Sequence, residues 1–265
     1  MAITLTVTDS PALRQALAAG SLTVDAVETT GPRAADAAAY FAGRPLLLHN
    51  SVWDTSLAHP TAFARDDLVE LTRRLLCLTG APFLSVHLGF AAADVAYTER
   101  GMQARSPALD RDELFARTCA SVRRFAAALP VPLVLENLDL GPSDAYRHVC
   151  RADFISAVLE ATASGLLLDL AHAQVTASRL CVDIEDYLAA LPLARVRQLH
   201  LSGPRPGADG TLRDAHDVLR DADYDLLARV LARTRPEVVT LEYHRDSAAL
   251  ARQVLRLRAT LDRLL

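Results

Sequence analysis

The sequence predicts an α/β barrel of eight parallel strands alternating with helices, a (β/α)8 TIM barrel formed as a single domain over residues 1–265. Two observations predict this class. Eight short apolar runs recur along the chain, and longer amphipathic stretches separate them. Each run is continuously apolar, which is typical of strands buried on both faces of a parallel sheet. A doubly wound sheet is the alternative, but no G-x-G-x-x-G motif follows the first run.

The predicted strands are the apolar runs themselves, and most of them end in a His, Glu or Asp. This polar ending places a charged or hydrogen-bonding side chain at the carboxyl end of nearly every strand. In chain order the strands are Ile3–Val7, Val24–Glu28, Pro45–His49, Phe83–His87, Pro132–Glu136, Gly165–Asp169, Val196–His200 and Val238–Glu242.

The helices are predicted from apolar residues three and four positions apart and from helix start signals. The segment Asp110–Leu129 begins with the acidic sequence DRDE, which suits the positive N-terminus of a helix. Two longer connections, Gly89–Pro107 and Ser202–Asp223, are predicted as functional loops. The predicted helices are Pro11–Ala19, Pro32–Phe41, Ala64–Leu78, Asp110–Leu129, Ala152–Ala163, Ile184–Leu191, Tyr224–Thr234 and Ser247–Leu265.

The composition excludes several classes of chemistry. All 28 basic residues are Arg, which excludes a Schiff base on Lys, a P-loop Lys and a Lys general base. The net charge of −4 gives no reason to expect a nucleic-acid partner. No run of 18 apolar residues occurs, and the first 30 residues lack a basic, apolar leader. We therefore expect a cytoplasmic protein with no membrane partner.

The polar residues at the strand ends predict a metal site. The carboxyl ends of all strands in such a barrel open onto one face, so these side chains should converge there. Clustered carboxylates are costly to desolvate unless cations neutralise them, and His with Asp or Glu binds Zn, Mn or Fe. A central Glu136 could bridge two ions roughly 3.5–4 Å apart. The predicted ligands are His49, His87, Glu136, Asp169, His172, His200, Asp214, His216 and Glu242.

Further residues near these ligands are predicted to act on a substrate. Asn137 follows Glu136 and could orient a substrate or a ligand, so we assign catalytic roles to Glu136, Asn137 and His200. Trp53, Arg205 and Glu28 are the predicted substrate-binding residues. The alternative for each of these three is a structural role: core packing for Trp53, a solvated loop side chain for Arg205, and a salt bridge for Glu28.

At these residues the chain resembles the xylose-isomerase-like TIM-barrel superfamily. The order of the ligands along the sequence matches that of endonuclease IV. The resemblance implies one ion at His49, His87 and Glu136, a second at Glu136, Asp169, His200 and Glu242, and a third at His172, Asp214 and His216.

The sequence around the ligands is more similar to the DUF692 group, the multinuclear non-heme iron oxidative enzymes. The similarity lies in the segments LLLHNS, LVLENL, GLLLDLAHA, RQLHLSG and DAHD. The resemblance implies two or three iron ions, although the same ligands could take zinc or manganese. It also implies O2-dependent modification of a cysteine-containing peptide or small thiol in natural-product biosynthesis, with a partner protein that presents the peptide.

A metal enzyme without redox chemistry is the alternative: an endonuclease IV-like phosphodiesterase or a sugar isomerase/epimerase. His172 stands where the iron group often has an amide, which favours a nuclease-like third metal position. The segment Gly89–Gly101 is nearly neutral, whereas a nuclease should offer basic loops to DNA. A xylose isomerase would use a Lys near its metals, and this chain has none.

Overall fold

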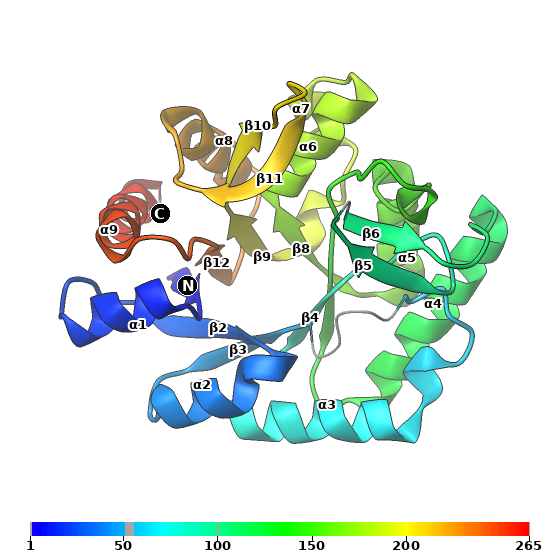
Figure 1. Cartoon of the computed structure of the whole chain (residues 1–265), viewed down its shortest axis with the longest axis horizontal. Helices are drawn as coiled ribbons and strands as arrows, with labels where there is room; N and C mark the ends of the chain where they lie inside the picture. Colours follow the sequence, from blue (N-terminus) through cyan, green and yellow to red (C-terminus); the bar gives the residue numbers. More distant parts are fainter. Residues whose placement is uncertain (1, 51–55, 100, 265) are drawn as a thin grey trace.

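Eight parallel strands close into a barrel in the computed structural model, which describes residues 2–50, 56–99 and 101–264 (Figure 1). The last barrel strand pairs with the first, so the sheet has no free edge. The predicted (β/α)8 class is confirmed. Around the barrel the strands are β1 (Thr4–Thr8), β2 (Ala26–Thr30), β3 (Leu46–His49), β4 (Leu84–His87), β7 (Leu133–Glu136), β8 (Gly165–Asp169), β9 (Val196–Leu201) and β12 (Val238–Leu241).

Alternation along the strands divides the barrel interior into an apolar floor and a polar layer above it. Successive side chains of a strand point to opposite faces, so residues two apart share a face. Leu47 of β3, Val134 of β7 and Leu167 of β8 form a separate buried cluster with Phe83 and Val238. Two positions further along these strands lie His49, Glu136 and Asp169. The predicted ligands therefore rest on a packed apolar layer.

Helices surround the barrel and cover the outward apolar side chains of its strands (Figure 1). Ser10 caps α1 by accepting a hydrogen bond from the Leu13 N–H at 3.1 Å, and Pro11 occupies the first turn. No helix in the described ranges is long and apolar enough to cross a bilayer. The helices are α1 (Pro11–Ala18), α2 (Ala34–Tyr40), α3 (Asp66–Thr79), α4 (Arg111–Ala128), α5 (Ala152–Thr162), α6 (Leu170–Leu180), α7 (Ile184–Ala189), α8 (Asp221–Leu231) and α9 (Ser247–Leu264).

Beyond the predicted elements, the described part of the chain contains two hairpins and an additional α-helix, besides short 3-10 turns. Each of the two connections predicted as loops contains an antiparallel hairpin, β5 (Val95–Thr98) with β6 (Gly101–Ala104) and β10 (Gly203–Pro206) with β11 (Leu212–Asp217). Helix α6 follows β8 without any loop, so the predicted helix near residues 184–191 is the second helix of that connection. Both hairpins are labelled in Figure 1.

Candidate metal centre

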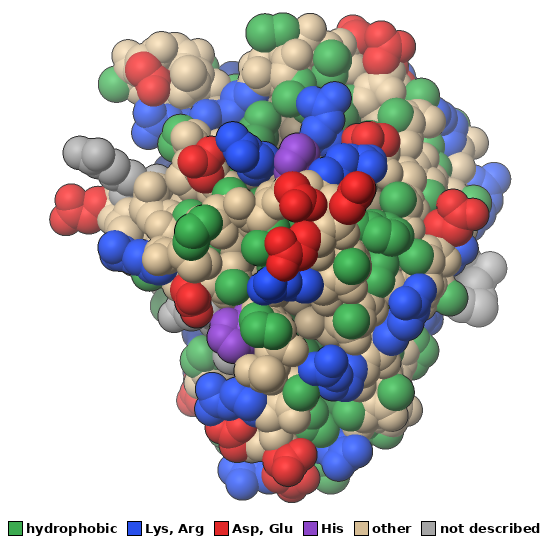
Figure 2. Space-filling model, turned by 90° about the vertical axis from the view of Figure 1, so that its right-hand side faces the viewer, with side chains coloured by type: hydrophobic (Ala, Val, Ile, Leu, Met, Phe, Trp, Pro, Cys, Tyr) green, Lys and Arg blue, Asp and Glu red, His purple; other side chains and the backbone are tan. Residues whose placement is uncertain are grey.

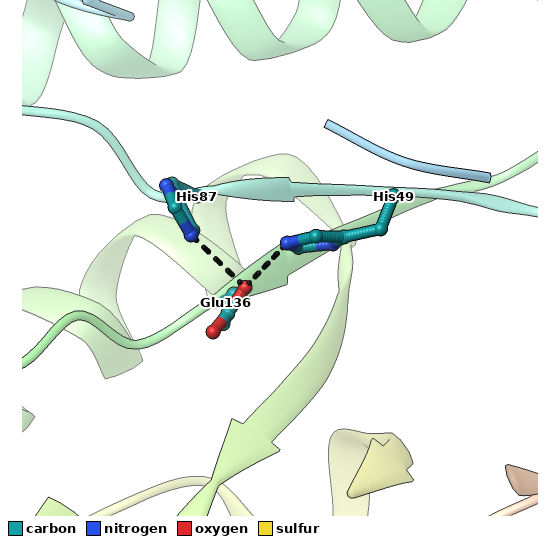
Figure 3. Close-up of side chains that lie close together, drawn as sticks. All are labelled: His49, His87 and Glu136. Atoms are coloured by element: carbon teal, nitrogen blue, oxygen red, sulfur yellow. Dashed lines mark ion pairs between the residues drawn. The ribbon is translucent and has the colours of Figure 1, made fainter. Parts of the chain in front are cut away.

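Glu136 lies between two imidazoles that come from neighbouring strands. His87 and Glu136 are paired residues of β4 and β7, and His49 is paired with Ser85 of β4. The Nε2 atoms of His49 and His87 lie 3.1 and 3.4 Å from Oε2 of Glu136 (Figure 3). One ligand atom from each of these three residues falls within 4.8 Å of the others. This spacing suits a single cation held by two imidazoles and one carboxylate.

Polar neighbours fix the orientation of His49. Its Nδ1 lies 2.9 Å from the Ser85 hydroxyl, which directs Nε2 toward Glu136. The buried Asn50 places its amide nitrogen 2.6 Å from Nε2 of His49, and its Oδ1 accepts a hydrogen bond from the His87 N–H. Asn50 adopts a left-handed conformation with φ 45°, which few residues other than Gly accept readily. Ser85 and Asn50 thus join the ends of β3 and β4 at the site.

Asp169 and His172 form a second group with Glu136. The Nδ1 of His172 lies 3.2 Å from Oε1 of Glu136 and 3.9 Å from Oδ1 of Asp169. The same Nδ1 lies 2.8 Å from the backbone carbonyl of Asn137. The Asn137 side chain exchanges two hydrogen bonds with the backbone of Asp169, so it joins β7 to β8. Asn137 is fully buried and holds both ligands in place.

His200 lies among three acidic side chains. Its Nδ1 lies 3.5 Å from Oε1 of Glu242 and 4.0 Å from Oε1 of Glu136. Its Nε2 lies 3.0 Å from Oε1 of Glu28. The ligand atoms of Glu28, His200 and Glu242 form a third group within 4.8 Å of one another.

The β10–β11 hairpin supplies the last two predicted ligands. On β11, Nδ1 of His216 lies 3.0 Å from Oδ2 of Asp214, and its Nε2 lies 3.3 Å from Oε2 of Glu242. The Nε2 of His172 lies 3.6 Å from Oδ2 of Asp214. The structure thus brings all nine predicted ligands into one contiguous set of contacts.

Several buried polar atoms in this set have no hydrogen-bond partner among the described residues. They are Oε2 of Glu136, Oδ2 of Asp169, Nδ1 of His200 and Oε1 of Glu28. A buried polar atom without a partner costs about 1–3 kcal/mol, and more when charged. Bound cations would remove this cost by accepting the same lone pairs, so the donor set fits divalent metal ions.

Without a metal, protons balance the acidic groups. Burial lowers the pKa of His87 to about 4, so this imidazole stays neutral. Burial opposes ionisation of Glu136, yet the imidazoles of His87 and His49 hold its pKa well below the ordinary range. Burial also opposes protonation of His216, yet hydrogen bonds to Asp214 and Glu242 raise its pKa to about 11. A cation entering this set would therefore displace protons from it.

A cavity of about 590 Å³ opens onto the cluster. Its polar lining includes the predicted ligands His49, His87 and Glu136. Its apolar part comes from the β5–β6 hairpin and the segments after β4 and β7. Cavities that combine apolar walls with a few convergent polar groups are typical of small-molecule and cofactor sites. The apolar side chains of the wall are Phe90, Tyr97, Met102, Leu138 and Tyr146.

The predicted substrate-binding residues lie in different places. Glu28 lines the cavity and contacts His200. Arg205 pairs with Asp217 at 3.2 Å within the β10–β11 hairpin and donates hydrogen bonds to two backbone carbonyls. Trp53 lies outside the described residues. Roles in substrate binding for these three, and in catalysis for Asn137, stay predictions.

Ser85, Asn50 and Gln198 are polar residues at the site that the sequence prediction missed. Ser85 and Gln198 each lie two positions before a predicted ligand, on the same face of the strand. That spacing of two is the signal that could have identified them. Asn50 follows His49 directly, and its left-handed conformation has no sequence signal other than its residue type.

Solved structures with this fold include enzymes of several kinds. A D-tagatose 3-epimerase-like protein aligns over 99% of this chain and 100% of its own, with 14% identity and a TM-score of 0.61. Endonuclease IV from Thermus thermophilus aligns over 98% of this chain and 99% of its own, with 17% identity and a TM-score of 0.59. At these identities the similarity establishes the fold alone.

Curated relatives are more similar in sequence. A UPF0276 protein of Caulobacter vibrioides is 31% identical over 223 residues, which cover 82% of this chain and 76% of the relative. A UPF0276 protein of Bordetella pertussis is 32% identical over 164 residues, covering 60% of this chain. The match to this second relative spans 55% of its length.

A family model described as "RiPP precursor modification enzyme MbnB/TglH/ChrH" matches residues 25–261, which include every predicted ligand. This range begins one residue before β2 and ends in the helix α9. The predicted resemblance to the DUF692 group is confirmed by this match and by the UPF0276 relatives. The chain belongs to the MbnB/TglH/ChrH family of RiPP precursor modification enzymes.

Proposed function

We propose that this chain is an iron-dependent oxidative enzyme that uses O2 to modify the thiol of a cysteine-containing peptide or small molecule in natural-product biosynthesis. The observation that carries the proposal is the buried cluster of imidazoles and carboxylates at the base of an apolar-walled cavity. Family membership supports a peptide substrate. A cytoplasmic location and a separate protein that presents the peptide are further parts of the proposal.

The residues proposed to hold the metals are the nine predicted ligands, whose side chains contact one another at the mouth of the barrel. His49, His87 and Glu136 would hold one ion. Asp169, His200 and Glu242, together with the same Glu136, would hold a second ion. His172, Asp214 and His216 would hold a third. Bound iron would supply affinity for a thiolate sulfur and the capacity to pass electrons to O2. The same ligands also accept zinc and manganese, so the identity of the metal has to be measured.

The remaining side chains of the cavity are proposed to bind and shield the substrate. Phe90 and Tyr146 pack edge to face with ring centres 5.7 Å apart, which gives the wall a defined shape. Met102 on β6 is buried, whereas Tyr97 on β5 is exposed at the rim. An apolar group beside the reacting thiol would pack on this wall and exclude water from the cluster.

The proposal is tested on protein purified without oxygen. Two or three iron atoms per chain, a Mössbauer signal from coupled iron, and O2 uptake with a thiol peptide are the expected results. Mass spectrometry of the peptide should show a change confined to the cysteine residue. Replacing Glu136 or His200 by Ala should abolish both metal retention and turnover, whereas Glu160→Gln on the exposed face of α5 should retain them. Colourless protein with stoichiometric zinc would contradict the proposal.

A metal-dependent phosphodiesterase or a sugar isomerase/epimerase is the second candidate. The contacts of His172 and His216 with Asp214 favour it, because they complete a nuclease-like third set. Against it, the described residues lining the cavity include no Arg that would bind phosphate. On the face shown in Figure 2, Arg side chains are interspersed with Asp and Glu and form no continuous basic surface. Cleavage of abasic DNA by the zinc-loaded protein would support this candidate.

A further inference from the structure

Glu28 is a buried carboxylate at the end of the barrel strand β2, and it faces the ring of His200. Its two oxygens lie 3.0 and 3.2 Å from Nε2 of His200. The side chains of Glu28 and His200 are 1% and 0% exposed. No Arg lies within ion-pair distance of Glu28 among the described residues, so His200 is its basic partner there. Such a carboxylate is stable only if it is paired and hydrogen-bonded.

The two ring nitrogens of His200 face different groups. Nε2 faces Glu28, whereas Nδ1 faces Glu242 at 3.5 Å and Glu136 at 4.0 Å. Nδ1 is also one of the buried atoms without a hydrogen-bond partner. A nitrogen that donates a proton to a carboxylate has no lone pair for a cation. Only one of the two nitrogens can therefore bind metal, and its identity depends on where the proton lies.

A hydrogen-bond network below His200 surrounds the same Glu28 carboxylate. The Gln198 amide nitrogen donates to Oε2 of Glu28 and to Oγ1 of Thr240 at 2.9 Å, and it also lies 3.0 Å from Nε2 of His200. The Thr240 hydroxyl lies 2.6 Å from that of Thr6, which continues the network across the barrel. The two amide hydrogens of Gln198 serve only two of its three contacts; if they go to Glu28 and Thr240, Nε2 of His200 is left to donate its own proton to Oε2 of Glu28 at 3.2 Å. The two Glu28 oxygens facing Nε2 and the unpartnered Nδ1 point to a proton on Nε2 and a free lone pair on Nδ1.

We propose that Glu28 is a positioning residue that holds the Nε2–H of His200 and thereby makes Nδ1 the atom that binds the cation shared with Glu136 and Glu242. This inference rests on the proposed metal centre, and it replaces the substrate-binding role predicted for Glu28. A carboxylate behind a metal-bound imidazole orients the ring and raises its basicity; losing such a partner typically lowers metal affinity about 10- to 100-fold.

The direct test is a long-range ¹H–¹⁵N NMR spectrum of the full chain, labelled on histidine nitrogen and loaded with Zn²⁺. His200 is assigned by comparison with His200→Gln. In the wild-type protein we expect the proton on Nε2 and the zinc-induced shift on Nδ1. A zinc-induced shift on Nε2 would overturn the inference, because Glu28 would then be a competing ligand or a bystander.

Two variants of Glu28 separate its hydrogen bond from its charge. Glu28→Leu removes the acceptor and should weaken one class of Zn²⁺ site about 10- to 100-fold in a competition titration. Glu28→Gln keeps an acceptor oxygen, so it should retain the Nε2–H tautomer with a smaller loss of affinity. If a thermal melt shows that Glu28→Leu does not fold, the ¹H–¹⁵N spectrum of Glu28→Gln still shows which nitrogen of His200 carries the proton. Unchanged zinc affinity in both folded variants would overturn the inference.

The zinc experiments use neither iron, O2 nor peptide, so they fail independently of the proposed function. Protein that shows the expected tautomer but no oxidative turnover would overturn the proposed function and leave the role of Glu28 standing. Wild-type protein that binds no Zn²⁺ would overturn the metal centre and this inference with it. Glu160→Gln, which removes an exposed carboxylate from α5, is the matched control and should bind zinc as the wild type does.

Discussion

Asp169 accepts a hydrogen bond from the backbone N–H of His172 at 2.7 Å, and it is at once the last residue of β8 and the N-cap of α6. One carboxylate oxygen, Oδ1, thus caps the N-terminus of α6. The other, Oδ2, is buried without a hydrogen-bond partner among the described residues. The same residue therefore places His172 on the first turn of α6 and keeps one oxygen directed at the cluster.

Asp169→Asn should make the stability of the metal-free protein less dependent on pH. Burial raises the pKa of Asp169 from 3.8 to about 7, so the folded chain binds this proton more tightly than the unfolded chain. The free energy of unfolding that this group contributes therefore falls as pH rises from about 4 to 7. Urea unfolding with a chelator at pH 5 and pH 7.5 measures the effect. Equal pH dependence in the wild type and the variant would contradict it.

The helix-capping role of Asp169 is separable from its charge. Asn can accept the same backbone hydrogen bond, whereas Ala cannot, so Asp169→Ala should cost about 1 kcal/mol more stability than Asp169→Asn. Both variants should lose metal equally. Asp110, which caps α4 through two backbone N–H groups, is the matched control. Its Asn and Ala variants should differ by a similar amount while both retain metal. Unequal metal loss in the two Asp169 variants would show that the cap and the ligand are not independent.

Gly203→Ala should release the β10–β11 hairpin from the site. A Cβ at Gly203 would lie 2.3 Å from the backbone oxygen of Val218, which cannot move without shifting the hairpin. Because β11 carries Asp214 and His216, metal analysis should show loss of the third ion with the others retained. In Gly207→Ala the Cβ would meet the flexible end of Arg213, which can move, so this control should keep its full metal content.

Asn50 allows backbone strain to be measured apart from side-chain contacts. Both Asn50→Gly and Asn50→Ala lose the amide beside His49, so both should weaken binding at the His49 and His87 set to the same degree. Only Ala suffers from the left-handed φ of 45°, and it should be less stable than Gly by about 1 kcal/mol. Denaturant unfolding and metal titration measure the two effects. Ala163→Gly, at φ 54° in the C-cap of α5, should gain stability without affecting metal.

The barrel and the convergence of the predicted ligands on one face were predictable because both follow from one pattern. Apolar runs separated by amphipathic stretches specify parallel strands with helical connections, and the topology then directs every strand end to one face. Glu136, His200 and Glu242 were found in this way, since each stands at the end of its run. The contacts among them follow from strand register, which the sequence leaves undefined.

The elements that the sequence prediction missed have no long periodic pattern of apolar residues. The strands β5 and β6 are four residues each, and their side chains are mostly half-buried or exposed, so no clear alternation marks them. Helix α6 begins at the residue after β8, and its start coincides with a ligand, so Asp169 was assigned to chemistry alone. Arg205 stands close to His200 in sequence, but it is engaged by Asp217 within its own hairpin.

The closure of the barrel by β12 against β1 has a consequence for when the proposed ions could bind a newly made chain. Glu242 directly follows β12, so the ligand set proposed for the ion at His200 is complete only after β12 has been synthesised. The pocket of His49, His87 and Glu136 is synthesised earlier, yet β3, β4 and β7 form only part of the ring. We therefore expect the proposed centre to be complete only after β12 has paired with β1 and β9.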